Sequence, residues 1–212
     1  MKKVLTAALV CAVSTFAGWD YFPVIEDGKG EAKIACEQSR EGKKGIGPDC
    51  GDFKIRYSPM ANLELMSKVG YTLGARYQII PVISAGVDIG FPIPTDGWSF
   101  TPNAQFSMPL TEALTLGTNG QVTIYTEDQG IDLSAGIELD LAVGKSTIWF
   151  GCDFNREDLS DEDKGLEIVP MLGYVASAGN LSLGTSVGMA FGAAAGHKNF
   201  NTFIGLDASI QF

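Results

Sequence analysis

The last residues of the chain, NTFIGLDASIQF from Asn201 to Phe212, alternate between two kinds of residue without a break. One face carries Ile204, Leu206, Ala208, Ile210 and Phe212, and the other carries Phe203, Gly205, Asp207, Ser209 and Gln211. A period of two predicts a β-strand with one apolar face. Outer-membrane β-barrels use a strand of this kind, ending on an aromatic residue, as their final strand. The stretch therefore predicts a protein with lipid outside and water inside.

The start of the chain indicates export. Lys2 and Lys3 precede the apolar run Leu5–Val13, and small residues follow up to Ala17. This is the pattern of a secretory signal peptide, so we expect residues 1–18 to be removed. Residues 19–29 would then form an N-terminal segment, either periplasmic or a plug in the lumen, and residues 30–212 the barrel. No other run is apolar over the roughly 18 residues that a spanning helix needs.

Period-two segments fill the rest of the chain, with turns marked by Gly, Pro, Asn and Asp. They are 30–38, 52–58, 62–69, 71–80, 82–93, 97–108, 112–125, 130–143, 146–155, 165–176, 180–192 and 201–212. The prediction is an all-β, transmembrane, antiparallel up-and-down barrel of about twelve strands, an even number as in bacterial barrels. At Lys68–Thr72 the chain either makes a tight hairpin or fuses two strands, and fusion would leave ten or eleven.

Charged residues test the phase of these strands independently, because the faces are assigned from hydrophobic residues alone. A charge facing mid-bilayer lipid costs about 2–4 kcal/mol for Lys or Arg. Twelve charged residues of these strands fall on the predicted inner face: Lys54, Arg56, Glu64, Lys68, Arg76, Asp88, Asp132, Glu138, Asp140, Asp153, Glu167 and Asp207. We take these twelve residues as the candidate lumen lining.

The competing fold is a soluble β-sandwich or lipocalin-like barrel, in which the apolar face is the core. In segment 180–192 the opposite face would then be the solvent surface. That face carries Ser182, Gly184, Ser186, Gly188, Ala190 and Gly192. These residues are too small and too weakly charged for an ordinary soluble exterior, so the membrane barrel is favoured.

The lengths of the connections predict the orientation. If Phe212 lies on the periplasmic side, the short connections are periplasmic turns and the longer ones are extracellular loops. The two longest outer loops would be Arg40–Gly51 and Arg156–Lys164.

Several short segments resemble a known group of proteins. They are Phe22-Pro23-Val24, Ile55-Arg56-Tyr57-Ser58-Pro59, Asn62-Leu63-Glu64-Leu65 and Gly74-Ala75-Arg76-Tyr77-Gln78. The chain resembles uncharacterised bacterial outer-membrane barrels that are grouped as transporters with the MetA pathway of phenol degradation. The resemblance implies the barrel fold and the outer membrane more firmly than any substrate. These relatives carry a longer loop where this chain has Val69–Thr72.

The four cysteines include Cys11 in the predicted signal peptide. Cys36 and Cys50 flank the first long connection, and in an oxidising compartment they either form a disulfide or remain two free thiols. Cys152 lies on an apolar face and is interpreted as a small hydrophobic residue. Neither cysteine spacing nor neighbouring histidine suggests a metal site.

Catalysis and cofactors find no support in the sequence. The sole histidine, His197, has no identifiable Ser and carboxylate partners, and no GxSxG motif occurs. The acidic run between Glu157 and Asp163 is not a calcium loop, because a frame that starts at Asp153 has Asp158 at the glycine position and ends on Lys164 where a Glu is required. It is a solvated loop or a weak cation-bridging surface. We therefore predict a protein that is not an enzyme and has no cofactor.

Charge excludes one class of partner. The formal charge is −10. Loss of Lys2 and Lys3 leaves 13 basic against 25 acidic residues, or about −12. A chain this acidic lacks the positive footprint that nucleic acids require. Expected partners are outer-membrane lipid and lipopolysaccharide, the barrel-assembly machinery through the C-terminal strand, and small solutes.

The order of the charges along the chain suggests a function. Basic residues come from early strands and acidic ones mostly from later strands, so closure would set a basic wall opposite an acidic wall. Such a lumen either orients and filters small solutes, or its charges pair across it and fill it. The favoured hypothesis is a passive channel or transporter for small solutes in the outer membrane. The alternative is a closed structural or adhesive barrel that acts through its outer loops.

Overall fold

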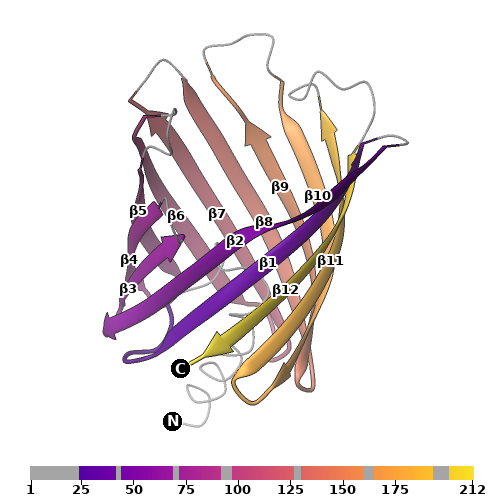
Figure 1. Cartoon of the computed structure of the whole chain (residues 1–212). Coiled ribbons are helices and arrows are strands. Elements are labelled where there is room, and N and C mark those ends of the chain that lie inside the picture. Colours follow the sequence, from indigo (N-terminus) through magenta and orange to yellow (C-terminus); the bar gives the residue numbers. More distant parts are fainter. Residues whose placement is uncertain are drawn as a thin grey trace.

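The computed structural model describes residues 24–41, 44–68, 72–91, 97–126, 130–159, 165–192 and 201–212, without the side chains of 37, 39–52 and 201. These residues form one closed antiparallel barrel of twelve strands (Figure 1). The fold confirms the predicted all-β transmembrane architecture. The predicted signal peptide lies outside the described residues, as does most of the acidic run.

The strands follow one another around the barrel in sequence order. Their bounds are β1 Gly30–Glu41, β2 Lys44–Met60, β3 Leu63–Lys68, β4 Thr72–Ile80, β5 Ile83–Gly90, β6 Ser99–Pro109, β7 Leu114–Tyr125, β8 Ile131–Val143, β9 Ser146–Arg156, β10 Glu167–Ala178, β11 Leu181–Gly192 and β12 Asn201–Gln211.

The barrel closes where β12 pairs with β1, from Glu31 opposite Gln211 to Glu41 opposite Asn201. At the end of this seam, the N–H of Gly30 donates to the carbonyl of Phe212 at 2.8 Å, and the N–H of Phe212 donates back at 3.0 Å. The ring of Phe212 lies where a side chain on residue 30 would stand, 2.3 Å from an ideal Cβ. Glycine at position 30 therefore lets the last residue of the chain lie across the seam.

The two ends of the barrel differ in their connections. The end near the C-terminus carries short turns, and we call it the turn end (Figure 1). Three of its turns use a left-handed residue, namely Asn62, Gly144 and Gly179, at φ values of 67°, 66° and 64°. Short hairpins require such backbone angles. We call the opposite end the loop end.

Two expectations about the early strands are resolved. Lys68 pairs with Thr72 across separate antiparallel strands, so β3 and β4 form a hairpin and are not fused. The predicted loop Arg40–Gly51 is wrong, because β1 runs to Glu41 and β2 begins at Lys44. Irregular pairing continues through this region, with register shifts between Ala35 and Glu37 and again before Arg40. In this part of the hairpin the sequence no longer alternates between polar and apolar residues, so the period-two pattern did not predict the strands. Backbone pairing nevertheless continues up to Glu41 and Lys44.

The two faces of the barrel have opposite character. Large apolar side chains are exposed on the outside, among them Leu206 at 60% and Leu183 at 57%. Among the residues that the structure describes, the buried side chains are mostly polar or charged, and the buried large apolar ones are Ile25, Trp149, Val169 and Val175. This distribution is the reverse of a soluble sandwich, and it fits a wall that lipid surrounds. No helix long and apolar enough to cross a bilayer occurs in the described ranges.

The wall is uneven in height. β3 has 6 residues and β5 has 8, whereas β8 has 13. In Figure 1, β3 to β5 are visibly shorter than the strands on the other side of the barrel. The loop ends of these strands therefore lie deeper along the barrel than those of their neighbours.

Candidate functional site: the lumen

The twelve residues predicted to line the lumen lie on the face of the strands opposite the exposed apolar side chains. Each of the twelve candidates is buried or half-buried, whereas the residues that alternate with them are largely exposed. The structure gives several of these side chains partners on neighbouring strands, and it separates them into groups along the barrel. Those groups were not visible in the sequence.

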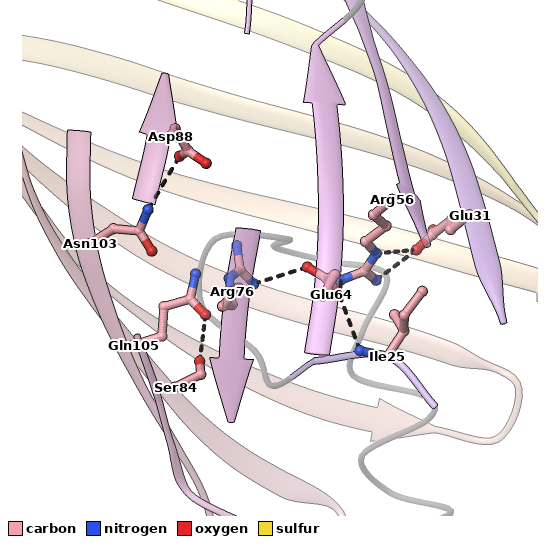
Figure 2. A network of polar contacts seen from close by, with 9 residues as sticks. All are labelled: Ile25, Glu31, Arg56, Glu64, Arg76, Ser84, Asp88, Asn103 and Gln105. Atoms are coloured by element: carbon pink, nitrogen blue, oxygen red, sulfur yellow. Dashed lines mark hydrogen bonds and ion pairs between the residues drawn. The ribbon is translucent and has the colours of Figure 1, made fainter. Parts of the chain in front are cut away.

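An ion network crosses the first four strands near the turn end (Figure 2). Arg56 on β2 donates to Glu31 on β1, with Nη2 at 2.6 Å and Nε at 3.0 Å from Oε2. The Nη1 of Arg56 also lies 3.5 Å from Oε2 of Glu64 on β3, and Arg76 on β4 lies 3.5 Å from Oε1 of Glu64. All four side chains are at most 2% exposed.

This network corrects the prediction of a basic wall formed by the early strands. Glu31 and Glu64 alternate with Arg56 and Arg76, so charge is balanced strand by strand at the turn end. Glu31 was missed because β1 was the weakest strand in the sequence. Its alternation of Glu31 and Lys33 with Ala32 and Ile34 was nevertheless a usable signal.

The segment before β1 contacts the network. The backbone N–H of Ile25 donates to Oε2 of Glu64 at 3.1 Å, and the side chain of Ile25 is buried (Figure 2). Glu64 therefore receives hydrogen bonds from β2 and from a segment outside the sheet. Sequence reasoning had no means to find this contact, because a backbone donor leaves no signature in side-chain pattern.

Hydrogen-bonded polar pairs continue the inner face onto β5 and β6 (Figure 2). Ser84 donates to Gln105 at 2.9 Å, and the amide of Asn103 donates to Asp88 at 3.2 Å. Asp88 is thus held by a neutral amide. The inner wall of β1 to β6 is a continuous band of hydrogen-bonding side chains.

The later strands carry an acidic pair beside a tryptophan. Glu138 and Asp140 on β8 are each 2% exposed. Neither oxygen of Asp140, nor Oε1 of Glu138, has a hydrogen-bond partner among the described residues. Asp140 is opposite Trp149 in the register, and the indole of Trp149 covers Gly173 on β10.

Positive charge gathers further toward the loop end. Lys33, Lys54 and Lys68 are directly opposite one another on β1, β2 and β3. The Nζ of Lys33 forms an ion pair with Asp207 on β12 at 3.4 Å. Lys33 is a second inner-face charge that the sequence reading missed.

A cavity of about 200 Å³ adjoins this row. It lies at the loop ends of the short strands β3 to β5 and extends to β6 and β7. Its lining is Lys54, Met66, Ser67, Lys68, Thr72, Asp88, Gly90, Ser99, Thr101, Gln121 and Thr123. Polar groups from six strands therefore surround one space on the inner face.

Asp132 has a different role from the other acidic candidates. It accepts hydrogen bonds from the hydroxyl of Tyr125 and from the backbone N–H of Asp158, both at 2.8 Å. Asp132 thereby ties the first residues of the acidic connection to the ends of β7 and β8. Asp153 and Glu167 are half-buried on β9 and β10.

Cysteine and metal predictions have separate outcomes. Cys36 is in a disulfide, and the side chain of Cys50 lies outside the described residues, so their pairing stays a prediction. Cys152 is a half-buried free thiol. His197 also lies outside the described residues. Within the described part of the chain, no three His, Cys, Asp or Glu residues are placed to hold a metal ion.

Comparison with known proteins supports the fold. No protein-family model matches the sequence, and the search of curated proteins gives no match. Among solved structures, the chain is similar to the CymD monoaromatic hydrocarbon channel, with a TM-score of 0.55, 7% identity and 88% of each chain covered. It is also similar to the KdgM porin in complex with disordered oligogalacturonate, with a TM-score of 0.53 and 14% identity over 86% of this chain and 99% of that one.

The fold is that of an outer-membrane β-barrel. Identities this low carry the likeness no further than the arrangement of the strands. These structures therefore agree with the barrel fold that the resemblance to the MetA pathway group implies. They do not connect the chain with that pathway.

Proposed function

We propose that this chain is an outer-membrane β-barrel that passes small solutes passively through its polar lumen. The observation that carries the proposal is the reversal of the two faces. Apolar side chains cover the outside, while the buried side chains are mostly charged or hydrogen-bonding, and residues of β2 to β7 line a cavity of about 200 Å³. A polar interior within an apolar wall is the arrangement of aqueous barrel channels.

The solved structures support the class of function and do not identify a solute for this chain. One is described as a hydrocarbon channel and the other as a porin. We also propose that the chain is related to the transporters grouped with the MetA pathway of phenol degradation. This part of the proposal rests on the sequence resemblance alone. Lipid and lipopolysaccharide would surround the apolar wall. The barrel-assembly machinery would recognise the strand that ends at Phe212.

In this proposal, the segment before β1 makes the solute path narrowest at the turn end. Residues 1–18 would be removed on export, and residues 19–29 would act as a plug at the turn end. The buried side chain of Ile25 and its hydrogen bond to Glu64 support this role over a free periplasmic segment. Solutes would then pass beside the ion network of Glu31, Arg56, Glu64 and Arg76.

Liposome swelling tests the proposal. Purified, refolded protein in liposomes should admit small sugars and amino acids at rates that fall with solute size. Liposomes with a matched amount of a known closed barrel serve as the control. Equal swelling in the two preparations would refute the channel.

A second function has one observation in its favour, which is the dense burial of the ion network. If these side chains fill the lumen, the barrel is closed and acts through its loops as a structural or adhesive protein. Deleting residues 160–163 from the acidic connection should then abolish binding to cells or surfaces and leave permeability unchanged. A channel predicts that the same deletion leaves solute entry intact without any loss of adhesion.

A further inference from the structure

Two carboxylates on β8 are buried without a partner among the described residues. Glu138 and Asp140 lie two residues apart on the inner face of the strand, or about 7 Å along it. Each is 2% exposed, and Oε1 of Glu138 and both carboxylate oxygens of Asp140 have no hydrogen bond to the described residues. A buried carboxylate is unfavourable unless a cation or hydrogen-bond donors offset its charge. A bound cation would therefore stabilise this pair.

The positions beside Glu138 on the inner wall carry no side chain. Gly117 on β7 and Gly151 on β9 are directly opposite it. An ideal Cβ on residue 151 would stand 3.7 Å from Oε2 of Glu138 and 3.4 Å from Cζ3 of Trp149. These are van der Waals distances. A ligand's methyl or methylene group therefore fits beside Gly151 and contacts the carboxylate and the indole together.

The combination of carboxylates with an indole favours an organic cation. Asp140 is directly opposite Trp149, and tryptophan attracts cations more strongly than the other aromatic side chains. Calcium and magnesium ions require about six or more oxygen ligands, and no three His, Cys, Asp or Glu residues in the described ranges are placed to hold a metal ion. A primary ammonium group donates three hydrogen bonds, which matches the three unpartnered oxygens.

We propose that Glu138, Asp140 and Trp149 form a binding site for a small primary alkylammonium cation. Its ammonium group donates to the unpartnered oxygens of Glu138 and Asp140, and its alkyl group lies beside Gly151 against the indole. The inference rests on the proposed channel function, because the ligand reaches the inner wall through the lumen. It names a class of solute that this lumen would favour.

Calorimetric titration of the detergent-purified, folded barrel with ethylammonium chloride tests the site directly. Ethanol has a similar skeleton and no charge, and tetramethylammonium has the charge and no N–H donor. Wild-type protein should bind ethylammonium saturably, tetramethylammonium at least about tenfold more weakly, and ethanol not at all. Equally tight binding of tetramethylammonium or of potassium ions would overturn the assignment in favour of a site for any cation. Absence of saturable ethylammonium binding would overturn it outright.

Asp140→Asn should weaken ethylammonium binding by about tenfold, the usual effect of losing one charged hydrogen bond. Asp132→Asn is the matched control, because it removes the same charge from the inner face of the same strand, about 20 Å or more from the site. It should leave the affinity within about twofold of wild type, since salt screens exposed charges beyond about 10 Å. Equal weakening by the two variants would overturn the site in favour of a general charge effect.

A further variant covers the risk that Asp140→Asn fails to fold. Gly151→Ala keeps every charge and places a methyl group where the ligand's alkyl group would lie, at ordinary distances from its neighbours. It should weaken ethylammonium binding by about fivefold or more, because the ligand loses its contact with the indole. Gly120→Ala, whose added Cβ meets no atom within 4 Å, should leave the affinity unchanged. Unchanged affinity in Gly151→Ala would contradict the site.

The titration also separates this inference from the proposed channel, because binding in detergent needs no conduction. Solute entry into liposomes without ethylammonium binding rejects this inference alone. Binding without solute entry rejects the channel alone.

Discussion

Trp149 is a large apolar side chain on an inner face that is otherwise mostly polar, and a glycine makes room for it. Its indole lies across Gly173 on the neighbouring strand β10 and packs with Val175 and Met171. An ideal Cβ on residue 173 would stand 2.2 Å from Cε2 of the indole. Residue 173 is therefore restricted to glycine by packing and not by backbone angle.

Gly173→Ala should destabilise the barrel by about 1–3 kcal/mol, because the added methyl group forces the indole out of its position. Gly120→Ala is the control, since an ideal Cβ there meets no atom within 4 Å. Urea unfolding in lipid vesicles, followed by tryptophan fluorescence, measures both. Equal stability of the two variants would contradict the packing described for Trp149.

Arg56 stabilises two buried carboxylates at once. Arg56→Met should cost about 3–5 kcal/mol, because Glu31 and Glu64 would remain buried without their shared cation. Lys29→Gln removes an ion pair with Glu26 whose two side chains are 57% and 60% exposed, and this should change stability by less than about 1 kcal/mol. The same unfolding assay compares the two variants. A loss for Arg56→Met no larger than for Lys29→Gln would show that the network contributes nothing beyond a surface pair.

At the scale of the strand, alternation decides which face meets lipid. On β11, Val187 is exposed on the outer face, and its neighbour Ser186 is half-buried on the inner face. Both residues are near the middle of the strand, so they lie at nearly the same depth in a bilayer. They differ only in the direction in which the side chain points.

Val187→Lys should reduce folding into lipid vesicles by about 2–4 kcal/mol, the cost of a lysine facing the bilayer midplane. Ser186→Lys places the same charge in the lumen and should cost much less. The measurement is the folding free energy of each variant in vesicles. A larger cost for Ser186→Lys would reverse the assignment of the two faces.

The sequence predicted strands well where a bilayer imposes alternation, and less well where it does not. Asn201–Phe212 was predicted as a strand, and β12 occupies Asn201–Gln211. The first part of β2 was missed, because its pairing with β1 depends on backbone hydrogen bonds and tolerates Gly45 and Pro48. Side-chain pattern carries no signal for such a segment.

The sequence predicted which face of each strand carries the charged residues. It did not predict which of these residues contact one another. Period two placed the charges on the inner face, because each strand reports its own phase. Which side chains contact each other depends on the register between neighbouring strands, and the sequence of a single strand does not determine that register. The opposition of Lys54 and Lys68, the balance of Arg56 by Glu31, and the contact of Ile25 with Glu64 all follow from register or from tertiary contact.

At the scale of the whole molecule, the barrel combines a charge-balanced turn end with a cavity at its loop end. The buried ion network and Ile25 occupy the turn end. Lys54, Lys68 and Asp88 line the cavity near the ends of the short strands. A solute that crosses this barrel meets the cavity and the network in turn.

Removing residues 19–27 from the mature protein should increase its conductance, because the proposed plug at the turn end would be gone. Val24→Ala, next to Ile25 and half-buried, is a control that keeps the segment in place. Single-channel recording measures both variants. Equal conductance of truncated and wild-type protein would place the segment outside the path.

Single-channel recording of the wild-type protein tests the central claim most directly. The folded barrel, inserted into a planar lipid bilayer with potassium chloride on both sides, should give discrete and reproducible conductance steps. Protease protection of the inserted protein confirms that it spans the bilayer. A barrel that is folded and inserted, yet gives no steps in salts of small and large ions alike, would contradict an open path through the lumen.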